Sequence, residues 1–282
     1  MGALYCLIGD PVEHSVSPHM FNAAFRDVGL DDHLYVALRV GRRELKSFIS
    51  SSKLIIGLRG FNVTIPHKIT IAKFMDRLQS EAREVGAVNT VKISGGRLHG
   101  FNTDVMAIRR ILPRRQVKGS AALILGVGGA ARAAAIALRD LGCLKQVFIG
   151  RRAQRLHDMA KFAEDRGIDY EQGKFRPSDL RRYSGSCGVI VNATPVGMYP
   201  RSGATPLPAD YIRNGSLVFD MVYNPPVTRL LRDARRRGAS TVGGLEMLIA
   251  QAVEAYRIWL GRRPDDAVMK RAALRGLRRF GV

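Results

Sequence analysis

The sequence predicts an α/β protein with two domains, each built around a mainly parallel sheet. Short apolar runs alternate with segments of helical periodicity through most of the 282 residues, as in successive βαβ units. One of these runs leads into the glycine-rich stretch GVGGAA at 126–131, and a helical pattern follows it. Because 46% of the residues are apolar, the chain can bury the core that such a fold needs.

The first hundred residues contain most elements of the first domain. Apolar runs predict strands at 4–9, 33–38, 60–65, 88–93 and 97–101. Between the first two runs, apolar residues follow the i, i+3, i+4, i+7 spacing of a helix. Ser17 is predicted as the N-cap of this helix, Pro18 as its first residue and Gly29 as its end.

A second series of elements follows a junction near 109–120, where proline, glycine and mixed charges occur together. Its predicted strands are at 121–125, 146–150, 189–193 and 217–221. After Gly243 and Gly244, residues 245–260 form an amphipathic helical pattern. The second series therefore predicts a further α/β domain, and a helix follows it in the chain.

Cysteine usage and hydropathy predict a soluble, cytoplasmic protein. Cys6, Cys143 and Cys187 are odd in number and show no CxxC spacing, which indicates a reducing compartment. No basic segment precedes the first apolar run, and no run approaches the ~20 residues that span a bilayer. We therefore expect no membrane partner. The six histidines show no spacing typical of metal ligands, so we also expect no bound metal.

The charge balance is strongly basic, with 45 Lys and Arg against 24 Asp and Glu, a net charge of +21. A nucleic-acid-binding protein on a dehydrogenase fold would show such an excess, and this remains a remote alternative. However, no helix-turn-helix, zinc-finger or RNP-like pattern accompanies the charge. We therefore expect no nucleic-acid partner, and a surface that attracts small anionic molecules.

The stretch 126–131 has the context of a dinucleotide-binding turn, because it follows a strand and opens a helix. Gly126 suits the tight turn, Gly128 allows close approach of a pyrophosphate, and Ala131 allows close helix–strand packing. The N–H groups of the helix N-terminus then favour the phosphates. The predicted cofactor contacts in this turn are Gly126, Val127, Gly128, Gly129 and Ala130.

The next predicted strand indicates which nicotinamide cofactor binds. It ends in Gly150-Arg151-Arg152, with Arg155 one turn further on. An NAD site places a carboxylate here for the ribose 2′-hydroxyl, and this strand end has none. Since guanidinium groups bind a 2′-phosphate through forked hydrogen bonds, the sequence predicts NADP.

Eight motifs in order give the chain a family resemblance. They are HSVSP (14–18), NVTIPHK (62–68), GAVNT (86–90), NTD (102–104), GVGGAARA (126–133), NATPVGM (192–198), DMVYNP (220–225) and GGLEMLIAQA (243–252). In this order and spacing, from residue 5 to about 260, the chain resembles the shikimate dehydrogenase family.

The resemblance implies a substrate-binding domain at 1–104, a Rossmann-type NADP-binding domain at 105–243, and C-terminal helices at 244–282 that return to the substrate domain. It implies the reversible, NADPH-dependent reduction of 3-dehydroshikimate to shikimate, a step of aromatic amino-acid (chorismate) biosynthesis. Hydride addition to a ketone requires a proton donor, and Lys68 falls at the position of the family's catalytic lysine, with Asp104 as the matching carboxylate.

The remaining site residues follow from the same resemblance. The substrate carboxylate and ring hydroxyls are expected to contact Ser15, Ser17, Thr64, Asn89, Asp104, Tyr223 and Gln251. The cofactor is expected to contact, besides the glycine-rich turn, Gly150, Arg151, Arg152, Arg155, Thr194, Met221, Gly244 and Met247.

Two departures from the family pattern leave alternatives open. Val105 replaces the glycine that usually follows NTD, and we expect its side chain to point into the core. The second strand end keeps only the arginine of the usual NRT. A quinate/shikimate dehydrogenase using NAD or NADP is therefore the alternative enzyme. Separately, the protein is expected to be a monomer or a homodimer.

Overall fold

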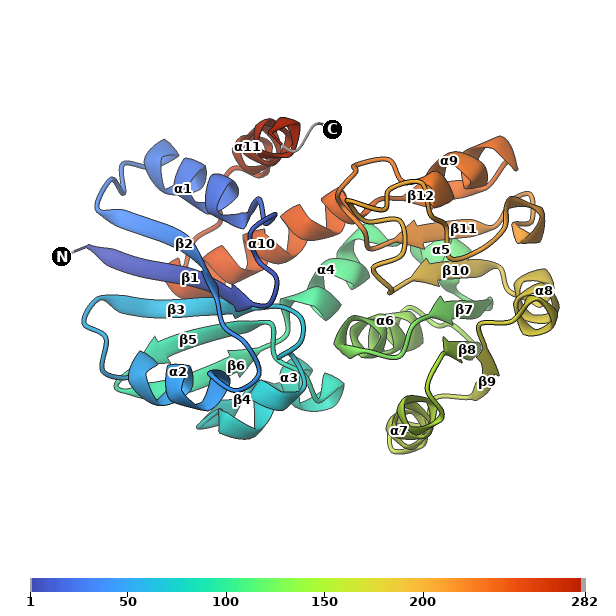
Figure 1. Cartoon of the computed structure of the whole chain (residues 1–282), viewed down its shortest axis with the longest axis horizontal. Coiled ribbons are helices and arrows are strands. Elements are labelled where there is room, and N and C mark those ends of the chain that lie inside the picture. The colour runs from blue at the N-terminus through green and yellow to red at the C-terminus, as the bar shows by residue number, and fades with distance from the viewer. Residues whose placement is uncertain (1, 280–282) are drawn as a thin grey trace. The chain divides into compact units, whose positions relative to one another are not determined.

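The computed structural model describes residues 2–279, and the chain forms two compact units (Figure 1). The first unit contains Met1–Met106 and Ile249–Val282, and the second contains Ala107–Leu248. Their boundaries fall within two helices, α4 (Thr103–Ile111) and α10 (Gly244–Leu260). The α/β class predicted from alternating patterns is confirmed.

The first unit contains a mixed sheet in the order β2-β1-β3-β5-β6-β4. Its strands are β1 (Ala3–Gly9), β2 (His33–Arg39), β3 (Leu58–Val63), β4 (Arg77–Leu78), β5 (Thr90–Ser94) and β6 (Arg97–Phe101). Strands β2, β1 and β3 are parallel, whereas β5 is antiparallel to β3 and β6. The five predicted strands are confirmed to within about two residues, and the two-residue β4 was not predicted.

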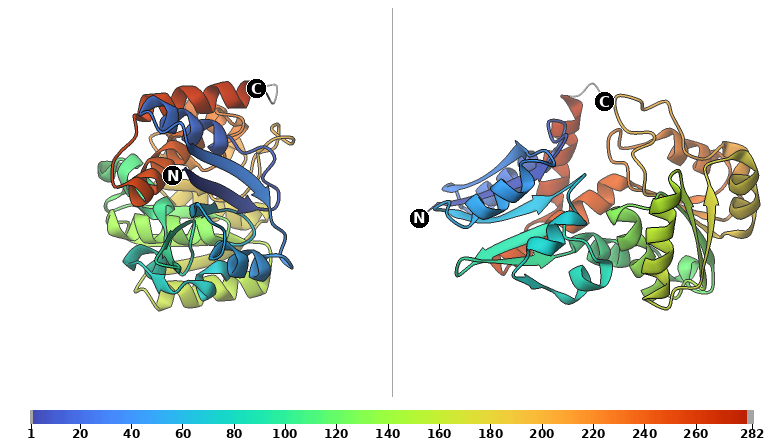
Figure 2. Two further views of the ribbon diagram at one scale, coloured as in Figure 1. Left: turned by 90° about the vertical axis from the view of Figure 1, so that its left-hand side faces the viewer. Right: turned by 60° about the horizontal axis from the view of Figure 1, so that its bottom comes forward.

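Helices cover both faces of this sheet. On one face lie α1 (Ser17–Asp27) and α10, since the Tyr5 ring lies 5.4 Å from Phe25 and 4.7 Å from Trp259. On the other face, α2 (Leu45–Ser52) packs on Cys6 and Ile8. The unit also contains η1 (Thr70–Phe74), α3 (Ser80–Val85) and α11 (Asp266–Arg278). Helix α11 lies alongside α1 (Figures 1 and 2).

The start of α1 differs from the prediction. Ser17 is the first helical residue and Val16 occupies the N-cap position without a side-chain hydrogen bond. The Ser15 hydroxyl instead accepts a hydrogen bond from the Ser17 backbone N–H at 3.2 Å. This hydrogen bond satisfies the N–H of the first helical residue, and the N-cap position is Val16, one residue before the predicted Ser17. The predicted end is confirmed, because Gly29 follows the helix with φ +70°.

The second unit contains a fully parallel sheet in the order β12-β11-β10-β7-β8-β9. Its strands are β7 (Ala121–Leu125), β8 (Lys145–Gly150), β9 (Tyr170–Lys174), β10 (Val189–Asn192), β11 (Leu217–Asp220) and β12 (Ser240–Val242). This is the doubly wound order whose direction reverses between β7 and β10. The four predicted strands are confirmed, whereas the edge strands β9 and β12 were missed because they are polar or short.

The helices of the second unit also lie on both faces of its sheet. Helices α6 (Gly129–Asp140) and α7 (Ala153–Glu164) cover one face. Helices α8 (Pro177–Ser186) and α9 (Arg229–Arg236) pack against the other. Short helical segments α5 (Arg114–Val117) and η2 (Ala209–Tyr211) complete the unit.

Helix α4 begins with a polar cap and continues as a buried segment. The Asn102 side chain accepts a hydrogen bond from the Val105 backbone N–H at 3.1 Å, which caps the helix. Val105, Ile108 and Leu112 are all buried, as predicted for Val105. Across residues 2–279, no helix is long and apolar enough to span a bilayer.

Candidate functional site

In the first unit, Lys68 and Asp104 form a direct ion pair. Lys68 lies just beyond the end of β3, and Asp104 lies in the first turn of α4. The Lys68 Nζ donates to Asp104 Oδ2 at 2.6 Å, and the two side chains are 19% and 4% exposed. Because the carboxylate is almost fully buried and the ammonium is partly accessible, the lysine can still reach another molecule.

Asn89, which is itself fixed by Thr103, holds the Asp104 carboxylate in place. The Asn89 amide N–H₂ donates to Asp104 Oδ1 at 2.8 Å and to Thr103 Oγ1 at 2.9 Å. In return, Asn89 Oδ1 accepts from the Thr103 backbone N–H at 2.7 Å. The Gln251 side chain of α10 accepts from Thr103 Oγ1 at 3.5 Å. The structure thus brings four predicted residues together around one carboxylate: Lys68, Asn89, Asp104 and Gln251.

A buried chain of hydrogen bonds extends from this cluster to the core. Asn62 donates to Thr90 Oγ1 at 2.9 Å, and the Tyr35 hydroxyl donates to Asn62 Oδ1 at 2.7 Å. Thr90 Oγ1 in turn donates to Asn89 Oδ1 at 3.2 Å. Sequence reasoning missed Tyr35, Asn62, Thr90 and Thr103. A polar residue at a buried position of a predicted strand, such as Asn62, was the signal that could have identified them.

Ser17 lies at the far end of this chain. Burial raises the pKa of Tyr35 well above its ordinary value, and a hydrogen bond with Ser17 opposes that shift. Ser17 is buried, whereas Ser15 and Thr64 are partly exposed. Ser15 and Thr64 are therefore the more accessible hydroxyls of the predicted substrate set. His67, between Thr64 and Lys68, contacts the Val40 carbonyl through Nε2 at 2.6 Å, which is a structural role.

In the second unit, the glycine-rich turn lies at the reversal point of the sheet. Gly126 has φ +114°, and a Cβ there would lie 2.9 Å from the Ala193 carbonyl oxygen and 3.2 Å from Thr194 Cγ2. The turn after β7 therefore packs against the turn after β10, where ligands bind in doubly wound sheets. A Cβ on Gly128 would meet no atom within 4 Å, so the space above this residue is open. These features fit a pyrophosphate at the N-terminus of α6.

The predicted arginines lie beside this turn. Gly150 ends β8, and a Cβ on it would lie 3.3 Å from Val127 Cγ2 of the glycine-rich turn. Arg151, Arg152 and Arg155 follow it, all exposed, and Arg152 occupies the N-cap position of α7. No carboxylate occurs from 150 to 157 in the sequence. Three exposed guanidinium groups at a helix N-terminus are suited to a phosphate monoester.

The other predicted residues of the second unit lie beyond β10, β11 and β12. Thr194 donates its hydroxyl to Asn192 Oδ1 at 2.6 Å. Gly244 lies against the chain after β11, since a Cβ there would come within 2.6 Å of the Met221 carbonyl oxygen. Tyr223 and Met221 are partly exposed, and Met247 is buried. These residues thus line the ends of strands that neighbour the glycine-rich turn.

Asp220, which ends β11, was not predicted as a site residue. It is fully buried and accepts hydrogen bonds from Thr228 Oγ1 at 2.6 Å and from the Val222 backbone N–H at 3.0 Å. The Asn192 amide also donates to it, at 2.9 Å. Burial raises the pKa of Asp220 to about 6, against the effect of these three donors. Asp220 thereby ties the turn after β10 to the turn after β11.

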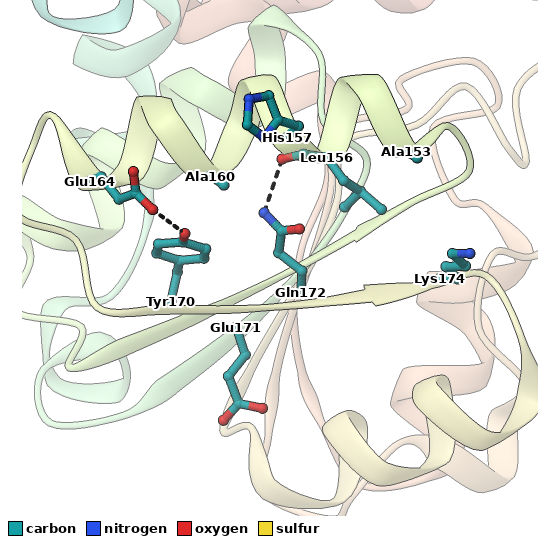
Figure 3. Close-up of a pocket in the computed structure, with 9 residues that line it drawn as sticks. All are labelled: Ala153, Leu156, His157, Ala160, Glu164, Tyr170, Glu171, Gln172 and Lys174. Atoms are coloured by element: carbon teal, nitrogen blue, oxygen red, sulfur yellow. Dashed lines mark hydrogen bonds between the residues drawn. The ribbon is translucent and has the colours of Figure 1, made fainter.

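A hollow of about 640 Å³ lies elsewhere in the second unit, between α7 and β9 (Figure 3). Its lining includes His157, Gln172 and Lys174, together with a Tyr170–Glu164 hydrogen bond of 2.6 Å. None of the predicted site residues lines it. Within the described part of the chain, no group of three or more His, Cys, Asp or Glu residues could hold a metal ion.

The comparisons with known proteins point to one family. Residues 7–91 match the shikimate dehydrogenase substrate binding domain, and residues 244–274 match the shikimate 5'-dehydrogenase C-terminal domain. The chain is 42% identical over 273 residues to the shikimate dehydrogenase (NADP(+)) of Methanocaldococcus jannaschii, with 95% of each sequence covered.

Solved structures show the same similarity. A crystal structure of a shikimate dehydrogenase in complex with NADP+ is similar with a TM-score of 0.87 and 38% identity, over 98% of this chain and 96% of that chain. A quinate dehydrogenase from Corynebacterium glutamicum in complex with NAD has a TM-score of 0.85 and 29% identity, over 97% and 99% of the two chains.

Proposed function

Because the chain belongs to the shikimate dehydrogenase family, we propose that it catalyses the reversible reduction of 3-dehydroshikimate to shikimate with NADPH. The observation that supports this most directly is the Lys68–Asp104 pair, at 2.6 Å, at the end of a strand. In this proposal the first unit binds the substrate and the second binds NADP. The protein acts in aromatic amino-acid biosynthesis in the cytoplasm, where its three free cysteines would stay reduced.

Lys68 provides the proton that the reaction needs. When hydride reaches the ketone carbon, negative charge develops on the oxygen, and a positioned acid must neutralise it. An ammonium has three N–H donors, so its bond to Asp104 leaves donors for the substrate oxygen. After proton transfer the lysine is a neutral amine and the substrate is an alcohol. Reprotonation from solvent restores the ammonium.

Asp104 orients the lysine and binds the substrate. Its Oδ2 contacts Lys68 while Asn89 holds its Oδ1, so the carboxylate cannot rotate freely. Its remaining lone pairs can accept a hydrogen bond from a ring hydroxyl next to the reacting carbon. Thr64, Asn89 and Gln251 supply further uncharged donors and acceptors for ring hydroxyls. Ser15, Ser17 and Tyr223 are assigned to the substrate carboxylate.

The cofactor site is assigned to the turns after β7, β8, β10 and β11 and to the start of α10. Gly126, Val127, Gly128, Gly129 and Ala130 would hold the pyrophosphate through backbone N–H groups. Arg151, Arg152 and Arg155 would hold the 2′-phosphate, with Gly150 at the turn. Thr194, Met221, Gly244 and Met247 are assigned to the nicotinamide side. NADPH bound there would supply the hydride.

Quinate is the second candidate substrate, because a quinate dehydrogenase shares this fold with a TM-score of 0.85. The test is a matrix of initial rates with shikimate, quinate or no acid, each with NADP+ or NAD+. We expect NADP+ reduction with shikimate to exceed every other combination. Comparable rates with quinate would instead assign the chain to the quinate-using enzymes. No reduction above the blank with either acid would refute the proposed activity.

A further inference from the structure

A second hollow, of about 290 Å³, lies in the first unit between α1 and α11. Its lining consists of two small residues and four basic ones: His19, Ala23, Arg26, Ala272, Arg275 and Arg279. On each helix these positions follow the spacing of one helical face. The hollow therefore lies along the seam where the two helices pack, and it contains none of the predicted site residues.

Small residues form the seam of this hollow. Gly276 allows α11 to approach α1 closely, since a Cβ there would lie 3.1 Å from His19 Cγ and from Val16 Cγ1. Ala23 and Ala272 add no long side chains next to it. The arginine side chains, which are exposed, can therefore extend around a recess whose inner surface is formed by methyl groups and an imidazole ring.

The arginines of this hollow lack partners in the described part of the chain. Among residues 2–279, no carboxylate within 4.0 Å and no side-chain hydrogen bond is found for the guanidinium groups of Arg26, Arg275 and Arg279. In contrast, other arginines pair closely with acids: Arg176 lies 2.8 Å from Asp179. Positive side chains that lie around one hollow without a nearby carboxylate favour an anion between them.

His19 adds a fourth group to this cluster. Its Nδ1 is buried and has no hydrogen-bond partner. Burial lowers the pKa of His19, and the nearby Arg279 lowers it further. Since a buried N–H without an acceptor is more costly than a buried lone pair, the neutral ring should carry its hydrogen on Nε2, where it can serve as a donor.

We propose that the hollow between α1 and α11 is a binding site for a small phosphate monoester. Guanidinium groups bind phosphate oxygens through forked hydrogen bonds, and the imidazole adds a further donor. The volume corresponds to roughly ten water molecules at ~30 Å³ each, enough for a phosphate and a short organic group. A monoester carries up to two negative charges near neutral pH, whereas each phosphate of a nucleic-acid backbone carries one. Three arginines around one hollow favour the doubly charged monoester.

The test measures the imidazole NMR signals of His19 in the full chain while a ligand is added. The signals are assigned by their absence from the spectrum of the His19→Gln variant. Methyl phosphate, a monoester, is compared with dimethyl phosphate, a diester of similar size, and with a duplex of ~20 base pairs. Because the signal is local, phosphate binding at Arg151 or Arg152 does not contribute. We expect methyl phosphate to shift the His19 signals saturably and dimethyl phosphate to bind at least tenfold more weakly.

Matched variants of α11 decide whether the hollow is responsible. Arg275→Gln with Arg279→Gln should abolish the shift, whereas Lys270→Gln with Arg278→Gln removes two charges outside the hollow and should keep it. Arg26→Gln, on the other helix, should weaken binding independently. The proposal is overturned if methyl phosphate gives no saturable shift, if both double variants respond alike, or if only the duplex shifts His19.

Discussion

Lys68 Nζ and Asp104 Oδ2 lie 2.6 Å apart, although 35 residues separate them in the chain. The pairing brings the end of a strand next to the N-terminal turn of a helix, where backbone N–H groups also favour the carboxylate. Asn89 fixes the second carboxylate oxygen from a third segment. The candidate acid is therefore held by contacts within the first unit alone.

Replacing Lys68 by alanine should lower kcat by roughly 10²–10⁴-fold, the usual contribution of a general acid. KM should change little, because the proton is needed in the transition state. Steady-state kinetics with shikimate and NADP+ measure both constants. Lys73→Ala, at an exposed position on η1, is the matched control and should behave as the wild type. A kcat close to the wild-type value in Lys68→Ala would remove this residue from the mechanism.

Replacing Arg151 by alanine should weaken NADPH binding by about tenfold or more and leave NADH binding nearly unchanged. The reason is that only NADPH carries the 2′-phosphate that a guanidinium at the end of β8 can bind. Fluorescence titration of the two reduced cofactors measures the ratio of their Kd values. Lys161→Ala, an exposed residue further along α7, is the control. Equal losses for both cofactors would mean that Arg151 does not read the 2′-phosphate.

Alanine at Gly126 and alanine at Gly128 should have different effects. Gly126 has φ +114° and a Cβ would lie 2.9 Å from a carbonyl oxygen, so Gly126→Ala should lower the free energy of unfolding by about 1–3 kcal/mol. Gly128 has φ −98° and open space around it, so Gly128→Ala should fold normally. Its methyl group would occupy space assigned to the pyrophosphate, and NADP+ binding should weaken.

Thermal unfolding and NADP+ titration of both glycine variants separate stability from binding. Wild-type affinity in Gly128→Ala would show that the cofactor does not approach this turn. Wild-type stability in Gly126→Ala would show that the turn relaxes without strain.

Asp220 should make stability depend on pH. Its pKa in the folded protein, about 6, lies above the ordinary value of 3.8, so the native state binds more protons between these values. Its contribution to stability is complete below about pH 4 and is lost as the pH rises through about 6. Asp220→Asn cannot ionise and should gain stability relative to wild type across this range, by up to about 3 kcal/mol.

Urea unfolding from about pH 4 to 7 measures this relative gain, and any constant offset from altered hydrogen bonds does not affect its slope. Asp210→Asn is the control, because Asp210 is exposed on η2. If the free energy of unfolding of Asp220→Asn and of Asp210→Asn changed with pH in parallel across this range, the pKa of Asp220 would not be raised.

Local patterns in the sequence were sufficient for most elements of the fold. Short apolar runs predicted β1 and β7, and a glycine with positive φ follows the end of α1 as expected. Strand β9 was missed because its sequence, YEQGK, is mostly polar, as an edge strand can be. The predicted cap at Ser17 was wrong, because Val16 occupies the N-cap position and the Ser15 hydroxyl accepts a hydrogen bond from the Ser17 backbone N–H. Two serines that lie two residues apart offer alternative turns, and the local sequence does not specify which of them forms.

The sequence by itself determined the alternation of strands and helices, the glycine-rich turn and, through its motifs, the identity of Lys68 and Asp104 as candidates. Only the tertiary structure decided that Tyr35, Asn62 and Thr90 form a buried chain of hydrogen bonds beside this pair, and that Arg26 and Arg275 lie around one hollow. The physical reason is that periodicity and turn chemistry act between near neighbours in the chain. Contacts between distant residues depend on strand register and helix packing, which no local pattern encodes.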